Sequence, residues 1–321
     1  MRRSGFTLIE MIFAITLMAI TGGIVSSLLG KVYENYAIQQ ETSNLEFKSI
    51  QVLNQIEHYL KRSIPNSIML HDGSTDASGN LDVYNEDAYT ALLNIGYGSG
   101  NLDSNKTLIW LDMDIENLYG DGPQPNYNEW LNIKDSDDKK MISVDSKFGN
   151  IVDVQKNIFG TTNASPAIYY VYGNQQGTSY EKFYNKTNTT DLTAIFAIDQ
   201  SATISDNEFS LKRKPDEIGE IFYVTGTGYG LSLENHNLYL IYNYQPWDAL
   251  TSGTNTGNGE TFVDGTKQLL MENVKSFEFW SEYDTMRMKI CLYSNMNVDA
   301  DNTDDLDNKA SICKEKAIEV R

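Results

Sequence analysis

The sequence has few of the residues on which many enzymes and nucleic-acid-binding proteins depend. It contains three histidines, two cysteines, and only 25 lysines and arginines against 44 aspartates and glutamates. The resulting net charge of −19 disfavours a surface that binds phosphate groups, so we expect no nucleic-acid partner. The histidines lack the spacing of metal ligands, and HExxH, GxSxG and phosphate-loop patterns are missing. We therefore expect no enzymatic activity, and a membrane-anchored enzyme is the least favoured interpretation.

The most informative segment is the apolar N-terminus. Residues 1–5 read Met-Arg-Arg-Ser-Gly, and residues 6–29 are almost wholly apolar, with Glu10 as the only charge. As a helix this segment would be roughly 36 Å long, enough to cross a hydrocarbon core of about 30 Å. The two arginines favour a cytoplasmic N-terminus, with everything after Leu29 on the periplasmic side. The sequence thus predicts a single-pass protein of a bacterial inner membrane.

Glu10 distinguishes between the explanations of this apolar segment. A cleaved secretory signal and a plain membrane anchor both account for the hydrophobicity. Neither accounts for a carboxylate in the middle of the segment, which is costly to place in lipid and usually has a functional partner.

The stretch Gly5-Phe6-Thr7-Leu8-Ile9-Glu10 resembles the leader of type IV pilins and of type II secretion pseudopilins. The resemblance implies that a prepilin peptidase cuts between Gly5 and Phe6 and that Phe6 becomes the N-methylated end. It also implies that Glu10 is the glutamate that promotes assembly into a filament. The physical chemistry agrees, because the new amine of one subunit can neutralise the buried carboxylate of its neighbour.

Helical spacing of apolar residues continues beyond the membrane segment. No proline occurs in residues 6–64, and Pro65 supplies a stop. The pattern predicts one helix of about 58 residues, roughly 87 Å long, with residues 30–64 as its amphipathic continuation. Because strict heptads are not sustained, we expect this part to pack on the following domain and not to form a free coiled coil.

Residues 65–321 are predicted to form one β-rich periplasmic domain without an internal boundary. Aromatic and β-branched runs alternate there with clusters of Gly, Asn, Asp and Ser. The predicted strands are Thr107–Asp112, Ala167–Tyr172, Thr193–Ile198, Glu220–Thr225, Asn237–Tyr244, Ser276–Trp280, Arg287–Tyr293 and Ala317–Val320. The glycines of residues 226–230 fit a hairpin or bulged turn better than a dinucleotide loop, because a strand and not a helix follows them. We therefore expect an α+β, pilin-like fold, with a long N-terminal helix packed on an antiparallel β-rich C-terminal domain.

Two groups of residues near the C-terminus allow further predictions. Cys291 and Cys313 are expected to form a disulfide, which would stabilise the fold by roughly 3 to 4 kcal/mol; two free buried thiols are the alternative. Between them, Asp299, Asp301 and Asp305 are weak calcium candidates, but a solvated acidic loop is favoured because the spacing does not fit an EF-hand. No other cofactor is expected.

The segment from Leu238 to Tyr242, together with Leu269 to Phe279, resembles the layout of GspJ-like minor pseudopilins and of PilW-like minor pilins. The resemblance implies a structural subunit near the tip of a type II secretion pseudopilus. A minor pilin of a type IV pilus or competence system is the alternative. The implied partners are other minor pseudopilins or pilins, the prepilin peptidase and the inner-membrane assembly platform.

Overall fold

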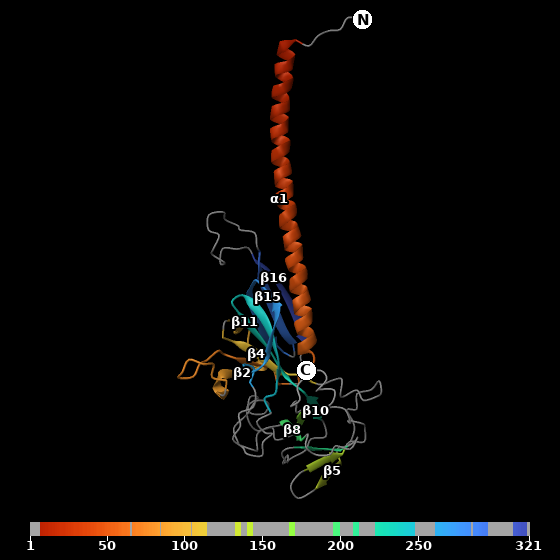
Figure 1. Cartoon of the computed structure of the whole chain (residues 1–321), viewed down its shortest axis with the longest axis vertical. Helices are drawn as coiled ribbons and strands as arrows, with labels where there is room; N and C mark the ends of the chain where they lie inside the picture. Colours follow the sequence, from red (N-terminus) through yellow and green to blue (C-terminus); the bar gives the residue numbers. More distant parts are fainter. Residues whose placement is uncertain are drawn as a thin grey trace.

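One long helix and three antiparallel sheets make up the part of the protein that the structure describes (Figure 1). The structure is a computed structural model that describes residues 7–64, 66–83, 85–103, 105–113, 132–135, 140–143, 167–170, 195–199, 208–211, 222–247, 261–283, 285–294 and 311–319. The sheets have the strand orders β13-β12-β11-β4-β1-β2, β16-β15-β14-β3 and β10-β7-β8-β9-β6-β5. The predicted α+β class is therefore confirmed.

The helices and strands have the following bounds. The helix is α1 (Leu8–Leu60), and two short 3₁₀ helices are η1 (Glu86–Ala88) and η2 (Leu92–Asn94). The strands are β1 (Met69–His71), β2 (Tyr89–Ala91), β3 (Gly100–Leu102), β4 (Thr107–Leu111), β5 (Asn132–Asp135), β6 (Lys140–Ser143), β7 (Ala167–Tyr170), β8 (Ile195–Asp199), β9 (Glu208–Leu211), β10 (Phe222–Thr225), β11 (Gly228–Glu234), β12 (Asn237–Tyr244), β13 (Thr266–Met271), β14 (Val274–Glu282), β15 (Thr285–Tyr293) and β16 (Ser311–Glu319).

Helix α1 is continuous over 53 residues, about 80 Å at 1.5 Å per residue. It ends at Leu60, four residues earlier than the sequence predicted. The chain leaves the helix there because it begins to pair with β4. Ser63 forms a bridge with Asp112, and the N–H of Ile64 donates to the carbonyl of Leu111 at 2.9 Å.

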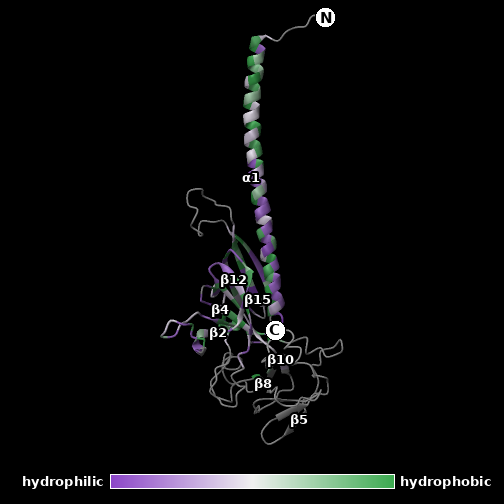
Figure 2. Ribbon diagram, in the orientation of Figure 1, coloured by the Kyte–Doolittle hydropathy of each residue, from purple (hydrophilic) through white to green (hydrophobic). Residues whose placement is uncertain are grey.

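The two halves of α1 have different surroundings. Hydropathy is high over the first half and mixed over the second, which lies beside β15 and β16 (Figures 1 and 2). The second half buries one face, formed by Leu45, Ser49, Val52, Leu53, Ile56 and Leu60. The spacing of three and four residues puts these side chains on one stripe, so this half packs on the sheet as predicted.

Strand β4 is central because both of its faces are buried. Leu108 and Trp110 belong to the core that α1 shares with β14 and β15. Ile109 and Leu111 belong to a second core on the other face, which includes Ala167 of β7. This double burial explains why β4 reads as an uninterrupted apolar run and not as an alternating pattern.

The eight strands predicted from the sequence each overlap an observed strand, and β12 matches its prediction at both ends. The predicted start of the last strand at Ala317 is wrong, because β16 begins at Ser311. Lysine and glutamate dominate its middle and hide the strand pattern. The glycines near residue 228 form a bulge at the start of β11, where a Cβ on Gly228 would lie 2.5 Å from the ring of Tyr244.

The sequence did not indicate that part of the outer domain is an insertion. Strands β4 and β11 are direct neighbours, with Leu111 opposite Gly228, and the N–H of Asp112 donates to the carbonyl of Thr227 at 3.1 Å. All six strands from β5 to β10 come from the chain between them and pair with one another. Figure 1 places β5, β8 and β10 beyond the C-terminal end of α1. This sheet is thus an elaboration beyond the C-terminal end of α1, within the predicted antiparallel β-rich region.

Strand β16 fastens α1 to the sheet. Lys314 lies 2.9 Å from the carboxylate of Glu46, and Lys316 contacts both Asn54 and Glu57. Hydrogen bonds from Lys316 and Lys61 hold the pKa of Glu57 below its usual value. The positively charged face of the last strand therefore matches the acidic side of the helix.

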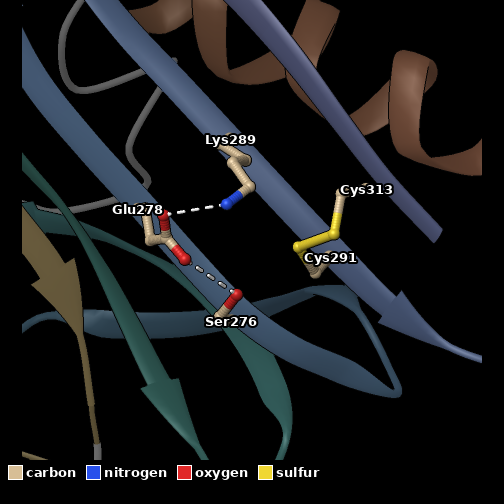
Figure 3. Close-up of a disulfide and its surroundings, with 5 residues drawn as sticks. All are labelled: Ser276, Glu278, Lys289, Cys291 and Cys313. Carbon is tan, nitrogen blue, oxygen red and sulfur yellow. Dashed lines mark hydrogen bonds and ion pairs between the residues drawn. A yellow bond between two sulfur atoms is a disulfide. The ribbon is translucent and has the colours of Figure 1, made fainter. Parts of the chain in front are cut away.

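The predicted disulfide between Cys291 and Cys313 is present (Figure 3). The two residues are directly opposite each other in the β15–β16 ladder, with Cα atoms 4.0 Å apart. Because side chains alternate along a strand, Cys313 points away from α1, whereas Lys314 points toward it. Close to the bridge, Lys289 pairs with Glu278 at 3.1 Å. The disulfide therefore locks the strand that carries the contacts with α1.

Replacing both cysteines with serine should lower the free energy of unfolding of the outer domain by about 3 kcal/mol. The physical reason is that the bridge closes a loop between residues 22 positions apart. Urea unfolding of the full chain in detergent measures the change. A reductant should shift the wild type to the same midpoint and leave the double variant unchanged. Equal midpoints for wild type and variant under oxidising conditions would contradict this role.

Candidate functional site

The start of α1 brings Thr7 and Glu10 together. Thr7 is the N-cap residue, and Glu10 stands three positions later in the first turn. The backbone N–H of Thr7 donates to Oε2 of Glu10 at 3.0 Å, and the Thr7 hydroxyl donates to the same oxygen at 2.9 Å. A glutamate at this position commonly satisfies a free N–H at the start of a helix. The only acidic side chain of the apolar half thus has donors within its own chain.

The side chains that follow Glu10 are exposed on every side of the helix. The large apolar residues of this segment with more than half of their surface exposed are Leu8, Ile9, Met11, Ile12, Phe13, Ile15, Leu17, Met18, Ile20, Ile24, Val25, Leu28, Leu29, Val32, Tyr33 and Tyr36. A helix that is apolar all round needs lipid or other helices around it. The helix is long and apolar enough to cross a membrane.

The hydroxyl groups within this segment are compatible with lipid. The hydroxyl of Thr16 donates to the carbonyl of Ile12 at 2.9 Å, and that of Thr21 donates to the carbonyl of Leu17 at 2.8 Å. Because the helix itself satisfies these groups, neither has to be left without a hydrogen bond in a bilayer. Within residues 7–29, Glu10 is the only charged side chain, and in a bilayer its charge would require a partner.

A smaller apolar surface lies on the second half of α1, on the side away from the sheet. Phe47 is 68% exposed and Ile50 is 47% exposed, and they are neighbours on the helix because they are three positions apart. The buried stripe of the same half faces β15 and β16 instead. The exposed pair therefore extends the apolar surface of the helix beyond the membrane segment.

The membrane-distal end of α1 is anchored by an ion pair and an aromatic cluster. Arg62 lies 3.1 Å from Asp112, whose side chain is 9% exposed. The ring of Tyr229 packs on both Tyr59 and Trp110, with centroid distances of 5.2 and 5.9 Å. Burial raises the pKa of Tyr229, so its hydroxyl stays protonated. These contacts fix the direction in which the helix leaves the outer domain.

The acidic residues of the loop between β1 and β2 have a structural role. Asp72 accepts a hydrogen bond from the N–H of Ser74, and Asp76 accepts from the N–H groups of Ser78 and Asn80. Across the described residues, no group of three or more His, Cys, Asp or Glu side chains could hold a metal ion. The calcium candidates Asp299, Asp301 and Asp305 lie outside the described residues, as do Gly5 and Phe6 of the predicted cleavage site.

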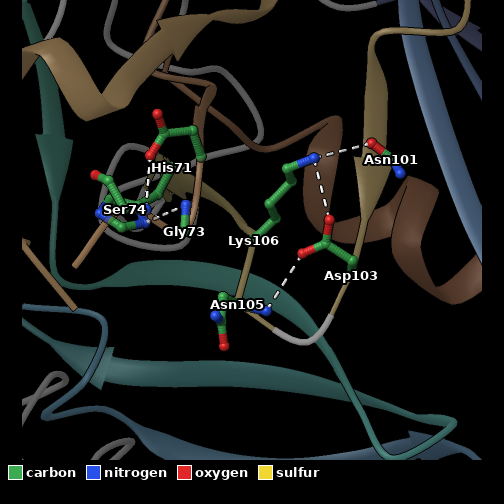
Figure 4. A network of polar contacts seen from close by, with 8 residues as sticks. His71, Gly73, Ser74, Asn101, Asp103, Asn105 and Lys106 are labelled. Carbon is green, nitrogen blue, oxygen red and sulfur yellow. Dashed lines mark hydrogen bonds and ion pairs between the residues drawn. The ribbon is translucent and has the colours of Figure 1, made fainter. Parts of the chain in front are cut away.

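A buried histidine belongs to the same region (Figure 4). Nδ1 of His71 accepts a hydrogen bond from the N–H of Gly73 at 3.1 Å, which leaves Nε2, 3.3 Å from the carbonyl of Asp82, as the donor. The ring also packs against Tyr89 and Phe262. Burial holds the pKa of His71 below its usual value, and the carbonyl of Asp82 offsets this only in part. The neutral imidazole is thus a packing element of the fold.

The comparisons with known proteins concern the N-terminal segment. Residues 1–26 match the family described as the prokaryotic N-terminal methylation motif. The match includes Glu10 and the first part of the exposed apolar helix, and it supports a likeness of this segment to the N-terminus of type IV pilin-like prepilins. A prepilin of this class is processed by a prepilin peptidase and assembles with other pilins. No curated protein and no solved structure matches the chain.

Acidification should destabilise the fold through His71. Its folded-state pKa is lowered, so between that value and the unfolded value of about 6.5 the unfolded chain binds more protons. Stability should therefore be fully present above pH 6.5 and be lost as the pH falls toward the folded pKa. Thermal unfolding between pH 7.5 and 5 measures this dependence.

The matched variants are His71→Gln, which should show a shallower loss, and His58→Gln on the exposed side of α1, which should follow the wild type. An unchanged pH dependence in His71→Gln would contradict the assignment.

Proposed function

We propose that this chain is a non-catalytic structural subunit of a pilin-like filament and acts through helix packing. The observation that carries the proposal is a prepilin N-terminus followed by an apolar helix that its own outer domain leaves exposed. In the membrane, lipid covers this helix. In the filament, the helices of neighbouring subunits replace the lipid, and Phe47 and Ile50 continue the contact outside the membrane.

Glu10 makes the packing of neighbouring helices specific for processed subunits. Cleavage after Gly5 creates an amine on Phe6 of each subunit. An amine of one subunit can pair with the Glu10 carboxylate of the next, and such charge-assisted bonds are stronger away from water. Before a neighbouring subunit is present, Thr7 stabilises the Glu10 carboxylate by donating two hydrogen bonds to it.

We further propose that the chain is a minor subunit of a type II secretion pseudopilus, with Arg2 and Arg3 in the cytoplasm and the outer domain in the periplasm. Its large outer domain, enlarged by the inserted sheet, supports a role at few positions, because helices pack only 8–10 Å apart and bulky domains on every subunit would collide. The strands β12, β13 and β14 span the segment that resembles GspJ-like pseudopilins. A minor pilin of a type IV pilus or competence system, with the same N-terminal chemistry, is the alternative.

Catalysis is no part of this proposal. Among the described residues outside the membrane segment, burial accounts for the shifted pKa values of the tyrosines Tyr229 and Tyr244 and of His71. Hydrogen bonds within ion pairs account for those of Glu57 and Arg287. The expected partners are other pilin-like subunits, the prepilin peptidase and the assembly platform.

The substitution Glu10→Gln tests the proposal. It should leave peptidase processing intact but lower the amount of the chain in sheared filaments by roughly tenfold or more, the effect of losing about 1.4 kcal/mol of charge-assisted bonding. Immunoblots of processed chain and filament fractions measure both steps. Glu34→Gln, which removes an exposed carboxylate of the same helix, is the control and should assemble normally. Normal assembly of Glu10→Gln would contradict the role of this carboxylate.

A further inference from the structure

Two joined loops at one end of the four-stranded sheet carry three exposed apolar side chains. Tyr283, in the turn between β14 and β15, is 92% exposed, whereas Tyr97 and Leu93, which precede β3, are 80% and 65% exposed. The two loops are joined because the N–H of Ser281 donates to the carbonyl of Ile95 at 2.9 Å. We call this surface, formed by Leu93, Tyr97 and Tyr283, the aromatic end.

Part of the aromatic end is held in place by the core. The ring of Tyr97 stands edge-on to Trp280, with centroids 5.0 Å apart and planes at 87°. Trp280 itself is only 7% exposed. Edge-to-face contacts of this kind order an aromatic ring without burying its outer face. Tyr97 therefore presents a positioned ring to the solvent.

Tyr283 has an unfavourable backbone conformation. Of the non-glycine residues with positive φ in the described part of the chain, four are asparagines and one is a histidine; the sixth is Tyr283, with a φ of 56°. Asparagine and histidine tolerate this region, whereas a bulky side chain there is an outlier. Tyr283 follows Glu282, which pairs with Thr285, so it lies in a tight hairpin connection, a place that ordinarily favours asparagine or glycine. Because the Tyr283 ring is exposed, it buries little surface against its own fold that would offset this strain.

The location of the aromatic end limits its partner. Thr285 pairs with Glu319 at the end of β16, and Lys316 of the same strand already contacts Glu57 near the end of α1. The aromatic end therefore lies beside the membrane-distal end of the helix. In a filament that grows from the membrane, each new subunit lies below the one that was added before it. The membrane-distal end of its outer domain therefore faces that earlier subunit. A second copy is disfavoured there, because two outer domains of a chain with a net charge of −19 repel.

We propose that the aromatic end docks onto the outer domain of a different pilin-like subunit, the one that precedes this chain in the filament, with Tyr283 as the anchor. Tyrosine and tryptophan dominate the centres of protein interfaces, and a protruding ring at a hairpin tip can fill a pocket of the partner. The inference rests on the proposed function, because it takes its direction from filament assembly.

Site-specific photo-crosslinking in assembled filaments tests the contact. A photoreactive phenylalanine at position 283 should crosslink the chain to another pilin-like subunit. The same group at Val263, which is 53% exposed in a different turn, is the matched control and should give at least tenfold less product. A product of the chain with itself, with a protein outside the filament, or no product above the control would overturn the proposal while the chain is present in filaments. If the wild-type chain is missing from filaments, the proposed function fails first and this inference falls with it.

A second variant separates docking from folding. Tyr283→Asn relieves the strain, so the Tm should rise by about 2–4 °C, while incorporation into filaments should fall about tenfold. Val263→Ser should leave incorporation unchanged. Unchanged incorporation of Tyr283→Asn, or a Tm below that of the wild type, would overturn the assignment of Tyr283 as a strained anchor.

Discussion

Helix α1 must be compatible with lipid along its first half and with a β-sheet along its second half, and the arrangement of the chain follows from that constraint. The first half exposes apolar side chains all round, so only lipid or other helices can cover it. The second half confines its apolar residues to one stripe and packs on β15 and β16. The single helix α1 therefore has one half that is packed on the outer domain and one half whose surface is free for other helices.

The electrostatic contacts of the two halves of α1 also differ. Outside the membrane, the acidic residues of α1 pair with the lysines of β16, and the disulfide locks that strand onto β15. Inside the apolar half, the donors to Glu10 among the described residues are the N–H and the hydroxyl of Thr7. Fixed contacts thus hold the outer domain, and in the proposed filament the Thr7–Glu10 contact would be exchanged for one with a neighbouring subunit.

The sequence predicts the features that depend on local chemistry. The absence of proline defines α1, its apolar pattern separates the two halves, and β12 is recognised at both of its ends. The bridge between Cys291 and Cys313 follows from compartment and spacing. The significance of Glu10 also comes from sequence, by its place in the Gly5–Glu10 motif.

Features that depend on distant pairing could not be predicted. Sequence shows strands between β4 and β11 but not that they pair only among themselves. The first four residues of β13 are exposed, and β16 is rich in charge, so neither has an apolar pattern to reveal it. The hydrogen bonds between Thr7 and Glu10, and the hydrogen bond between Ser281 and Ile95, require coordinates because the loops involved have no spacing signal.

The most direct measurement for the whole account is mass spectrometry of the mature N-terminus, on chain taken from cells that contain a prepilin peptidase. The account predicts a mass that corresponds to a chain starting at Phe6 with one added methyl group. A chain that retains Met1, or one that starts near Ile24, would show an ordinary anchor or secretory signal and would contradict assembly through α1.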